Sequence, residues 1–176
     1  LHAMPDSAPS IDERVKFTRL QLLYNHLPQG LIATAINASL LAYIVSAAVA
    51  PPLPVIWLIS VLGLCVVRAA SLVAFRKFAK TPSDYDRWRT YFATGALLNG
   101  AIWGIAGVAL FPSESYQHQA FIGFVLAGMA AGASGSMAAH DKIFRAFLVL
   151  SIAPYMFRLI VQGAPINLAM AAMSAV

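Results

Sequence analysis

Long apolar stretches separated by short polar segments dominate the pattern of this chain. A helix needs about 20 apolar residues to cross roughly 30 Å of hydrocarbon, and five stretches qualify. A sixth stretch ends after eleven residues. The pattern therefore predicts an all-α fold, a polytopic transmembrane helical bundle of six spans with the last one truncated. The predicted spans are 27–50, 55–75, 91–111, 121–140, 146–161 and 166–176, within a membrane domain at 26–176.

The segment before the first apolar stretch has a different pattern. We expect residues 1–10 to be a tag remnant and a disordered N-terminus. Ser10 and Glu13 then match the capping box that opens a helix. Residues 11–25 mix apolar and basic side chains at helical spacing, which predicts an amphipathic helix at the membrane surface. Pro28 marks either a bend or the start of the first span.

Basic residues predict the orientation of the spans. Three Lys and Arg precede the first span, five lie between the second and third, and two follow the fourth. The alternate loops contain none, and cytoplasmic loops are the ones enriched in Lys and Arg. We therefore expect a bacterial inner-membrane protein with a cytoplasmic N-terminus. A completed sixth span would return the chain to the cytoplasm, where a soluble domain could follow.

Composition agrees with this class. Hydrophobic residues make up 60% of the chain and charged residues 11%, against about 25% in ordinary globular domains. Mean hydropathy is +0.72. The net charge of +5 belongs to residues beside apolar stretches, so we predict a lipid bilayer and no nucleic acid as the partner. The single cysteine, Cys65, excludes a disulfide framework and a thiolate metal site within this chain.

Small residues recur every fourth position in the fourth span and predict a smooth ridge on that helix. Such rows let transmembrane helices approach closely, so we expect this helix to be the hub on which the others pack. The ridge either serves packing alone or also slides or forms a dimer. Its main row is Gly123, Ala127, Ala131, Gly135 and Ala139, and Gly128, Gly132 and Ser136 form a second row beside it.

Two arginines lie inside predicted spans. A cation within a span costs at least about 2.5–3.5 kcal/mol at the bilayer centre, so it is a functional-site hypothesis by default. Arg68 lies eight residues before Arg76, about 12 Å along the helix, and Arg158 lies four residues before Gln162. Both side chains can therefore either extend to the membrane surface as anchors or bind a carboxylate, phosphate or lipid headgroup.

Uncharged polar side chains form a second set of candidates. Asn37 lies in the first span, and Tyr155 lies near Arg158 in the fifth. In the third span Asn99 and Trp103 lie on one ridge between two glycines. This face either lines a small-molecule pocket or hydrogen-bonds to a neighbouring helix. The candidate ligand-binding residues are Asn37, Arg68, Asn99, Trp103, Tyr155 and Arg158.

Several chemistries find little support in the sequence. The histidines do not share facing positions inside the membrane, so we expect no metal site, haem or other cofactor. No nucleotide-binding, protease or hydrolase motif occurs, and we expect no enzyme activity from this chain. No predicted span contains Asp or Glu, and we find no inverted repeat, which counts against a proton-coupled transporter.

Three segments resemble the N-terminal multi-span sensor region of bacterial signalling proteins. They are LLYNHLPQGLIATAINASLLAY, WRTYFATGALLNGAIWGIAGVALFP and FVLAGMAAGASGSMAAH. In that family the membrane block precedes a sensor histidine kinase, often hybrid, or a diguanylate cyclase with GGDEF and EAL domains. Marks beyond composition are Asn25, Leu27, Pro28 and Gly30, and the Trp103–Gly104 pair before Phe111–Pro112. No phospho-accepting histidine or GGDEF motif is present, so no catalytic residue carries over.

The resemblance implies a homodimeric sensor module that controls a cytoplasmic output domain in the same parent chain. Because the predicted outer loops are short, we expect the stimulus to be an apolar ligand arriving through lipid, fatty-acid-like or ketone-like, or a property of the bilayer. Two alternatives remain open at this point. One is a small transporter or channel, and the other is a structural anchor that only dimerises and localises an output domain.

Overall fold

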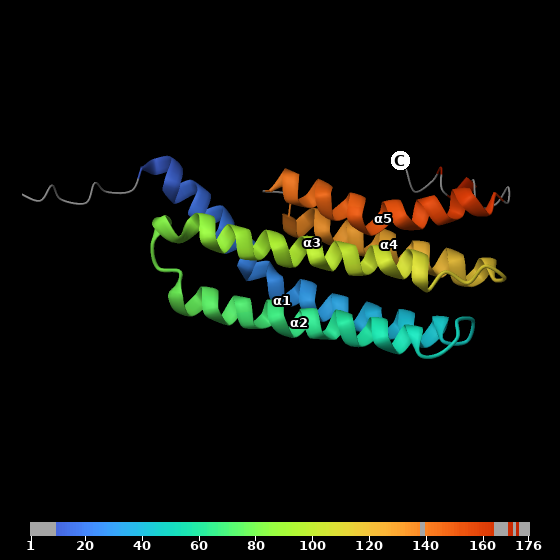
Figure 1. Ribbon diagram of the computed structural model, residues 1–176. Helices are drawn as coiled ribbons and strands as arrows, with labels where there is room; N and C mark the ends of the chain where they lie inside the picture. The colour runs from blue at the N-terminus through green and yellow to red at the C-terminus, as the bar shows by residue number, and fades with distance from the viewer. Residues whose placement is uncertain (1–9, 138–139, 164–168, 171, 173–176) are drawn as a thin grey trace, which may run out of the picture.

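The computed structural model describes residues 10–137, 140–163, 169, 170 and 172, and its architecture is a bundle of long helices (Figure 1). No strand occurs among these residues, which confirms the all-α class. Consecutive helices run antiparallel (Figure 1). The elements are α1 (Ile11–Val45), α2 (Leu53–Phe78), the 3-10 helix η1 (Pro82–Asp84), α3 (Tyr85–Ala109), α4 (Tyr116–Met137) and α5 (Asp141–Gln162).

Four helices in the described part of the chain are long and apolar enough to cross a membrane. They are α1, α2, the segment Pro82–Ala109 that includes α3, and α5. Large apolar side chains also cover their outer faces: Val66 is 69% exposed and Phe157 is 65% exposed. A surface of this kind suits lipid rather than water. The lengths and the surface together indicate a membrane protein.

Helix α1 is continuous over 35 residues and passes through Pro28. Proline lacks the N–H that would bond to the carbonyl four residues earlier, but one missing bond does not end this helix. The structure therefore does not separate the amphipathic segment 11–25 from the first span. Residues 1–9 and Ala139 lie outside the described residues, and so does most of 166–176.

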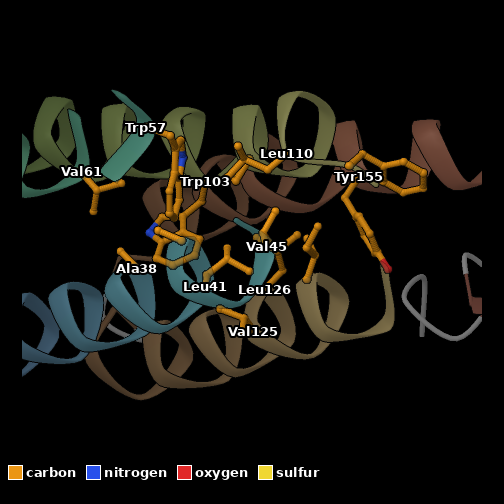
Figure 2. Packing of buried hydrophobic residues seen from close by; sticks show 14 of the residues in the cluster. Ala38, Leu41, Val45, Trp57, Val61, Trp103, Leu110, Val125, Leu126 and Tyr155 are labelled. Atoms are coloured by element: carbon orange, nitrogen blue, oxygen red, sulfur yellow. The ribbon is translucent and has the colours of Figure 1, made fainter. Parts of the chain in front are cut away.

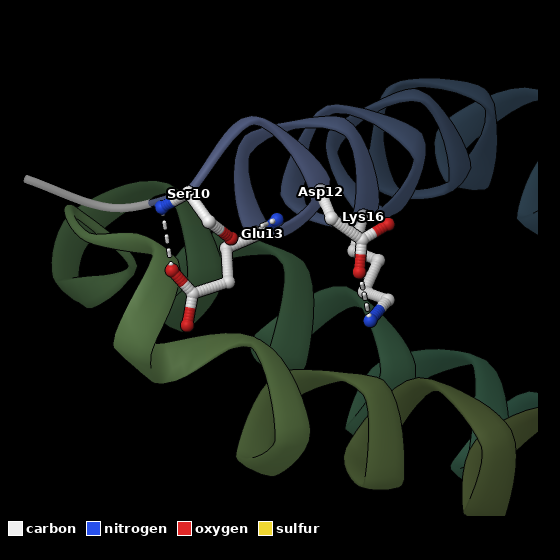
Figure 3. A network of polar contacts seen from close by, with 4 residues as sticks. All are labelled: Ser10, Asp12, Glu13 and Lys16. Atoms are coloured by element: carbon white, nitrogen blue, oxygen red, sulfur yellow. Dashed lines mark hydrogen bonds and ion pairs between the residues drawn. The ribbon is translucent and has the colours of Figure 1, made fainter.

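The start of α1 has the predicted capping box, which is confirmed (Figure 3). The Ser10 N–H donates to Glu13 Oε2 at 2.8 Å, and the Glu13 N–H donates to Ser10 Oγ at 3.3 Å. Two N–H groups that the first turn leaves without intrahelical partners are thereby satisfied. One turn later Lys16 forms an exposed ion pair with Asp12 (Figure 3).

One end of the bundle is basic. This end contains the start of α1, the end of α2 with its connection to the start of α3, and the start of α5 (Figure 1). These segments carry ten of the twelve Lys and Arg residues of the chain. We call it the basic end. The connections between α1 and α2 and between α3 and α4 lie at the opposite end and carry no Lys or Arg.

Two clusters of buried apolar residues hold the helices together. The first, nearer the end opposite the basic one, is built around Trp57 and Trp103, whose rings meet edge to face at 5.2 Å (Figure 2). The second, nearer the basic end, contains Tyr24 stacked on Phe75 with ring centroids 3.8 Å apart. The Tyr24 hydroxyl also donates to the carbonyl oxygen of Trp88 at 3.1 Å, which links α1, α2 and α3.

The closest helix contact joins α3 to α5 through glycines. A Cβ built on Gly104 would lie 2.0 Å from the carbonyl oxygen of Leu150. That carbonyl lacks its usual intrahelical donor because Pro154, four residues on, has no N–H. A Cβ on Gly107 would lie 2.7 Å from Tyr155 Cβ. Because Gly104 and Gly107 have a hydrogen atom in place of a side chain, the backbone of α3 can come this near to α5.

The expectation that α4 is the packing hub is wrong for this chain, because α3 holds that position. Helix α4 turns its bulky face, including Ile122 and Leu126, toward the bundle. Bulky side chains fill the space between helices, whereas a small-residue row gains contacts only against a closely approaching backbone. Gly123 meets the Tyr155 hydroxyl, 2.6 Å from its ideal Cβ position. The exposed members of the two rows are Ala127, Gly128, Ala131, Gly132 and Gly135.

Candidate functional site

Three of the six candidate ligand-binding residues come together around one cavity. Asn37 from α1, Arg68 from α2 and Asn99 from α3 all line it. The other three lie elsewhere: Trp103 and Tyr155 are in the first apolar cluster, and the Arg158 guanidinium lies over the ring of Phe111, a member of the same cluster. The fold thus brings half of the six candidate residues together at one site.

The cavity has a volume of about 260 Å³ and lies toward the basic end. Its walls combine the aromatic side chains of Phe92 and Phe147 with polar groups. Between α1 and α4 the lining residues are small and exposed, and this gap forms a lateral opening in the bundle. The small residues at the opening are Gly30 and Ala33 of α1 and Gly128 and Gly132 of α4.

Arg68 is the charged group of this cavity, and only 8% of its surface is exposed. Its guanidinium carbon lies 5.9 Å from the centroid of the Phe92 ring, within the range of a cation–π contact. Its Cγ and Nε atoms lie 3.3 Å from the position of a Cβ on Gly95, so the glycine leaves room for the side chain. The arginine is therefore packed between α2 and α3 and does not extend along the lipid-facing surface.

No hydrogen bond or ion pair joins Arg68 to another residue in the described part of the chain. Burying a cation without a counter-ion is costly, because the low-dielectric surroundings replace its hydration shell. Of the residues that line the cavity, Arg68 and the exposed His26 alone can carry charge. The cavity is consequently positive and suits an anionic group.

The two asparagines add uncharged polar groups to the same wall. The Asn37 amide donates to the thioether sulfur of Met129 at 3.4 Å, and a thioether is a weak acceptor. Asn99 is 5% exposed, and its side chain makes no hydrogen bond to any described residue. The expected bond from Asn99 to a neighbouring helix is therefore absent from the described part of the chain. Both amides have hydrogen-bonding capacity to offer a ligand.

Trp103 and Tyr155 serve packing rather than the cavity. Trp103 is completely buried against Trp57, whose indole N–H donates to the carbonyl oxygen of Ile102 at 2.8 Å. The Tyr155 hydroxyl donates to the carbonyl oxygen of Gln119 at 2.9 Å and so joins α5 to α4 (Figure 2). A buried hydroxyl with a backbone acceptor is a satisfied core group.

Arg158 has a separate environment near the end opposite the basic one. Its guanidinium carbon lies 5.1 Å from the centroid of the Phe111 ring. Its Nε is buried and has no acceptor within the described residues. The residue is only partly buried, and it does not line the cavity that contains Arg68. Its position fits the anchoring alternative better than the ligand-binding one.

His140 lies at the basic end, in the turn before α5. Burial of its ring lowers the pKa below the ordinary value of 6.5, and the positive charges of Arg89 and Arg19 act in the same direction. Its Nδ1 has no hydrogen-bond partner among the described residues. The surroundings therefore favour the neutral imidazole. No group of three or more His, Cys, Asp or Glu side chains that could hold a metal occurs in the described chain.

Sequence reasoning missed several polar residues of the cavity wall. His26 and Gln29 line it near the basic end, and Thr34 is buried beside it. The available signal was spacing: His26, Gly30 and Thr34 follow one another at four-residue intervals, as do Gln29, Ala33 and Asn37. Two such rows place polar and small residues on one face of α1.

Comparisons with protein-family models, with curated proteins and with solved structures find no match to this chain. The functional interpretation therefore depends on the cavity and its residues.

Proposed function

We propose that this chain is the transmembrane input module of a bacterial signal-transduction receptor. In this proposal it binds an apolar or amphiphilic ligand from the lipid and controls a cytoplasmic histidine kinase or diguanylate cyclase domain in the same parent chain. The observation that carries the proposal is Arg68, a buried cation with no counter-ion among the described residues, in a cavity that opens sideways. Charged groups inside membrane helices commonly mark binding or transport sites.

The proposed topology has six spans in the inner membrane and a cytoplasmic N-terminus. Besides the four helices of sufficient length and hydropathy, α4 has 22 residues and no Asp, Glu, Lys or Arg, and we count it as a further span. The run at 166–176 begins the sixth. Segment 11–25 of α1 lies at the cytoplasmic surface as a juxtamembrane helix. The concentration of Lys and Arg at the basic end supports this orientation.

Signalling in this proposal depends on the spacing of α1 and α4. Because the cavity opens between these two helices, an occupant alters the distance between them. The exposed small residues of α4 also permit a close approach of a second copy, so we place the homodimer contact there. A shift of α4 then changes both the dimer and the position of the sixth helix, which leads to the output domain.

A pair of glycine variants in the full-length protein tests this function. A Cβ at Gly30 or at Gly63 meets no atom within 4 Å, but only Gly30 lines the cavity opening. Gly30→Leu should block the opening and abolish the change in kinase or cyclase output on stimulation in the native host. Gly63→Leu is the matched control and should respond normally. A normal response from Gly30→Leu would contradict the proposed site.

A further inference from the structure

We propose that the cavity binds an amphiphile with a single oxyanionic group on an apolar chain, and that the guanidinium of Arg68 is the counter-ion of that group. This inference rests on the proposed receptor function and assigns the ligand's chemical class. A carboxylate and a phosphodiester share the required chemistry: one negative charge spread over two oxygens that accept paired N–H bonds from an arginine.

Arg68 has no countercharge among the described residues that line the cavity. Arg68 is more than nine-tenths buried and lines the cavity, yet no acidic side chain lines it. The acidic residues of the described chain lie near helix ends or in the connections, away from the middle of every helix. A ligand oxyanion would supply the charge that these residues cannot. The described acidic residues are Asp12, Glu13, Asp84, Asp86, Glu114 and Asp141.

Residues of α3 hold the Arg68 guanidinium in place. Phe92 contacts Arg68 from α3, and Gly95 leaves room for its side chain one turn later on the same helix. Asn99 follows Gly95 by another four residues and lines the same cavity, so its amide lies on the same face of α3. A headgroup bound to Arg68 therefore has a second hydrogen-bonding group close by, the Asn99 amide on the same face of α3.

The cavity lining carries a single permanent positive charge among the described residues, which limits the charge of the ligand. Arg68 is the single permanently charged residue of the lining within the described chain, and His26 lies at the exposed rim. Arg158, the other in-span arginine, does not line the cavity. A doubly charged phosphate monoester would bring one negative charge more than the permanent positive charge of the lining can neutralise. One oxyanion leaves the site neutral, which suits surroundings of low dielectric.

The cavity and its opening also accommodate the apolar chain of the ligand. Leu27, Met129 and Phe147 supply apolar walls, and the opening between α1 and α4 faces the lipid side of the bundle. A dry apolar cavity of about 150 Å³ holds a benzene molecule. A cavity of about 260 Å³ therefore has room for a headgroup and the first carbons of a chain. The rest of the chain would extend through the lateral opening into lipid.

Calorimetric titration of the intact protein in a neutral maltoside detergent tests the headgroup. Three probes are compared after subtraction of empty micelles: decanoate, 1-decanol of equal chain length, and dihexanoyl phosphatidylglycerol. We expect decanoate to bind at least about tenfold more tightly than decanol, because a charge-assisted bond forms only with the carboxylate. This comparison uses the unaltered protein, so it stands even where a variant fails to fold.

Three variants locate the charge. Arg68→Gln should weaken decanoate binding about tenfold or more and leave decanol binding unchanged. Arg68→Lys should fall between, because lysine keeps the charge and lacks the planar fork. Arg158→Gln is the matched control and should bind like the unaltered protein. Tryptophan fluorescence of each variant confirms that the core around Trp57 and Trp103 is intact.

The outcomes separate this inference from the receptor function. Tighter binding of phosphatidylglycerol alone, with the same dependence on Arg68, supports the oxyanion and identifies a bilayer lipid as its source. Equal binding of decanol and decanoate overturns the oxyanion assignment and leaves the receptor proposal standing. Absence of binding in all arms also overturns the inference, and the receptor proposal is then decided by the response of Gly30→Leu.

Discussion

The substitution Gly104→Ala tests the helix contact on which the bundle depends. The added Cβ would lie 2.0 Å from the carbonyl oxygen of Leu150, whereas ordinary van der Waals contact begins at 3.4 Å. The added Cβ would also lie 3.0 Å from the Cγ of Pro154. The oxygen belongs to the backbone, so no rotamer change relieves the overlap. Helices α3 and α5 must move apart by an amount of the order of the difference, about 1.4 Å.

Overpacking of a close-packed interior costs about 1–3 kcal/mol, and a backbone obstacle places Gly104→Ala in the upper half of that range. Gly63→Ala is the matched control on α2, because a Cβ there meets no atom within 4 Å and the residue lies outside the cavity and the proposed dimer contact. It exchanges a poor helix former for a good one and should be neutral or stabilising by up to about 1 kcal/mol. We therefore expect the free energies of unfolding of the two variants to differ by about 2–4 kcal/mol.

The difference can be measured by titrating the purified protein in maltoside micelles with dodecyl sulfate. Trp57 and Trp103 lie in the core, so their fluorescence reports loss of packing. If Gly104→Ala unfolds at the same dodecyl sulfate fraction as Gly63→Ala, the close approach of α3 and α5 would be refuted.

Three further predictions concern single groups. Tyr155→Phe removes the hydrogen bond from the Tyr155 hydroxyl to the Gln119 carbonyl and should lower the free energy of unfolding by about 1 kcal/mol in the same titration, whereas the 79% exposed Tyr43 should tolerate the same change. Because the pKa of His140 is lowered in the folded chain, the unfolded chain takes up the proton first on acidification. Stability should therefore fall as the pH decreases below 6.5, and less so in His140→Gln. Ser10→Ala removes the capping bond and should speed hydrogen exchange in the first turn of α1 without changing the unfolding midpoint of the bundle.

Much of the architecture was predictable because it follows from length and periodicity. Runs of apolar residues of membrane-spanning length specified the helices, and the side-chain pattern of Ser10 and Glu13 specified where the first one begins. The rarity of charge inside a span was enough to select Arg68. These signals are local, so they can be read from the sequence without knowing which helices become neighbours.

The remainder depends on neighbours that one helix cannot reveal. The spacing of Gly123 and Gly135 describes a smooth face on α4, but a smooth face can contact its own bundle or look outward. Gly104 carries the closest contact because Pro154 lies opposite it on α5. Trp103 shares a ridge with Asn99, yet the indole meets Trp57 and the amide meets the cavity. Only the rotation of each helix in the bundle separates these roles.

Photolabelling of the intact protein with a diazirine-bearing decanoic acid tests directly whether an oxyanionic amphiphile occupies the cavity around Arg68. Mass spectrometry would map each labelled peptide, with and without excess unlabelled decanoate as competitor. We expect competed labels to fall on segments 26–37 of α1 and 128–137 of α4, which line the cavity and its opening. Competed labels at lipid-facing positions such as Val66 and Phe157, or an absence of any competed label, would contradict it.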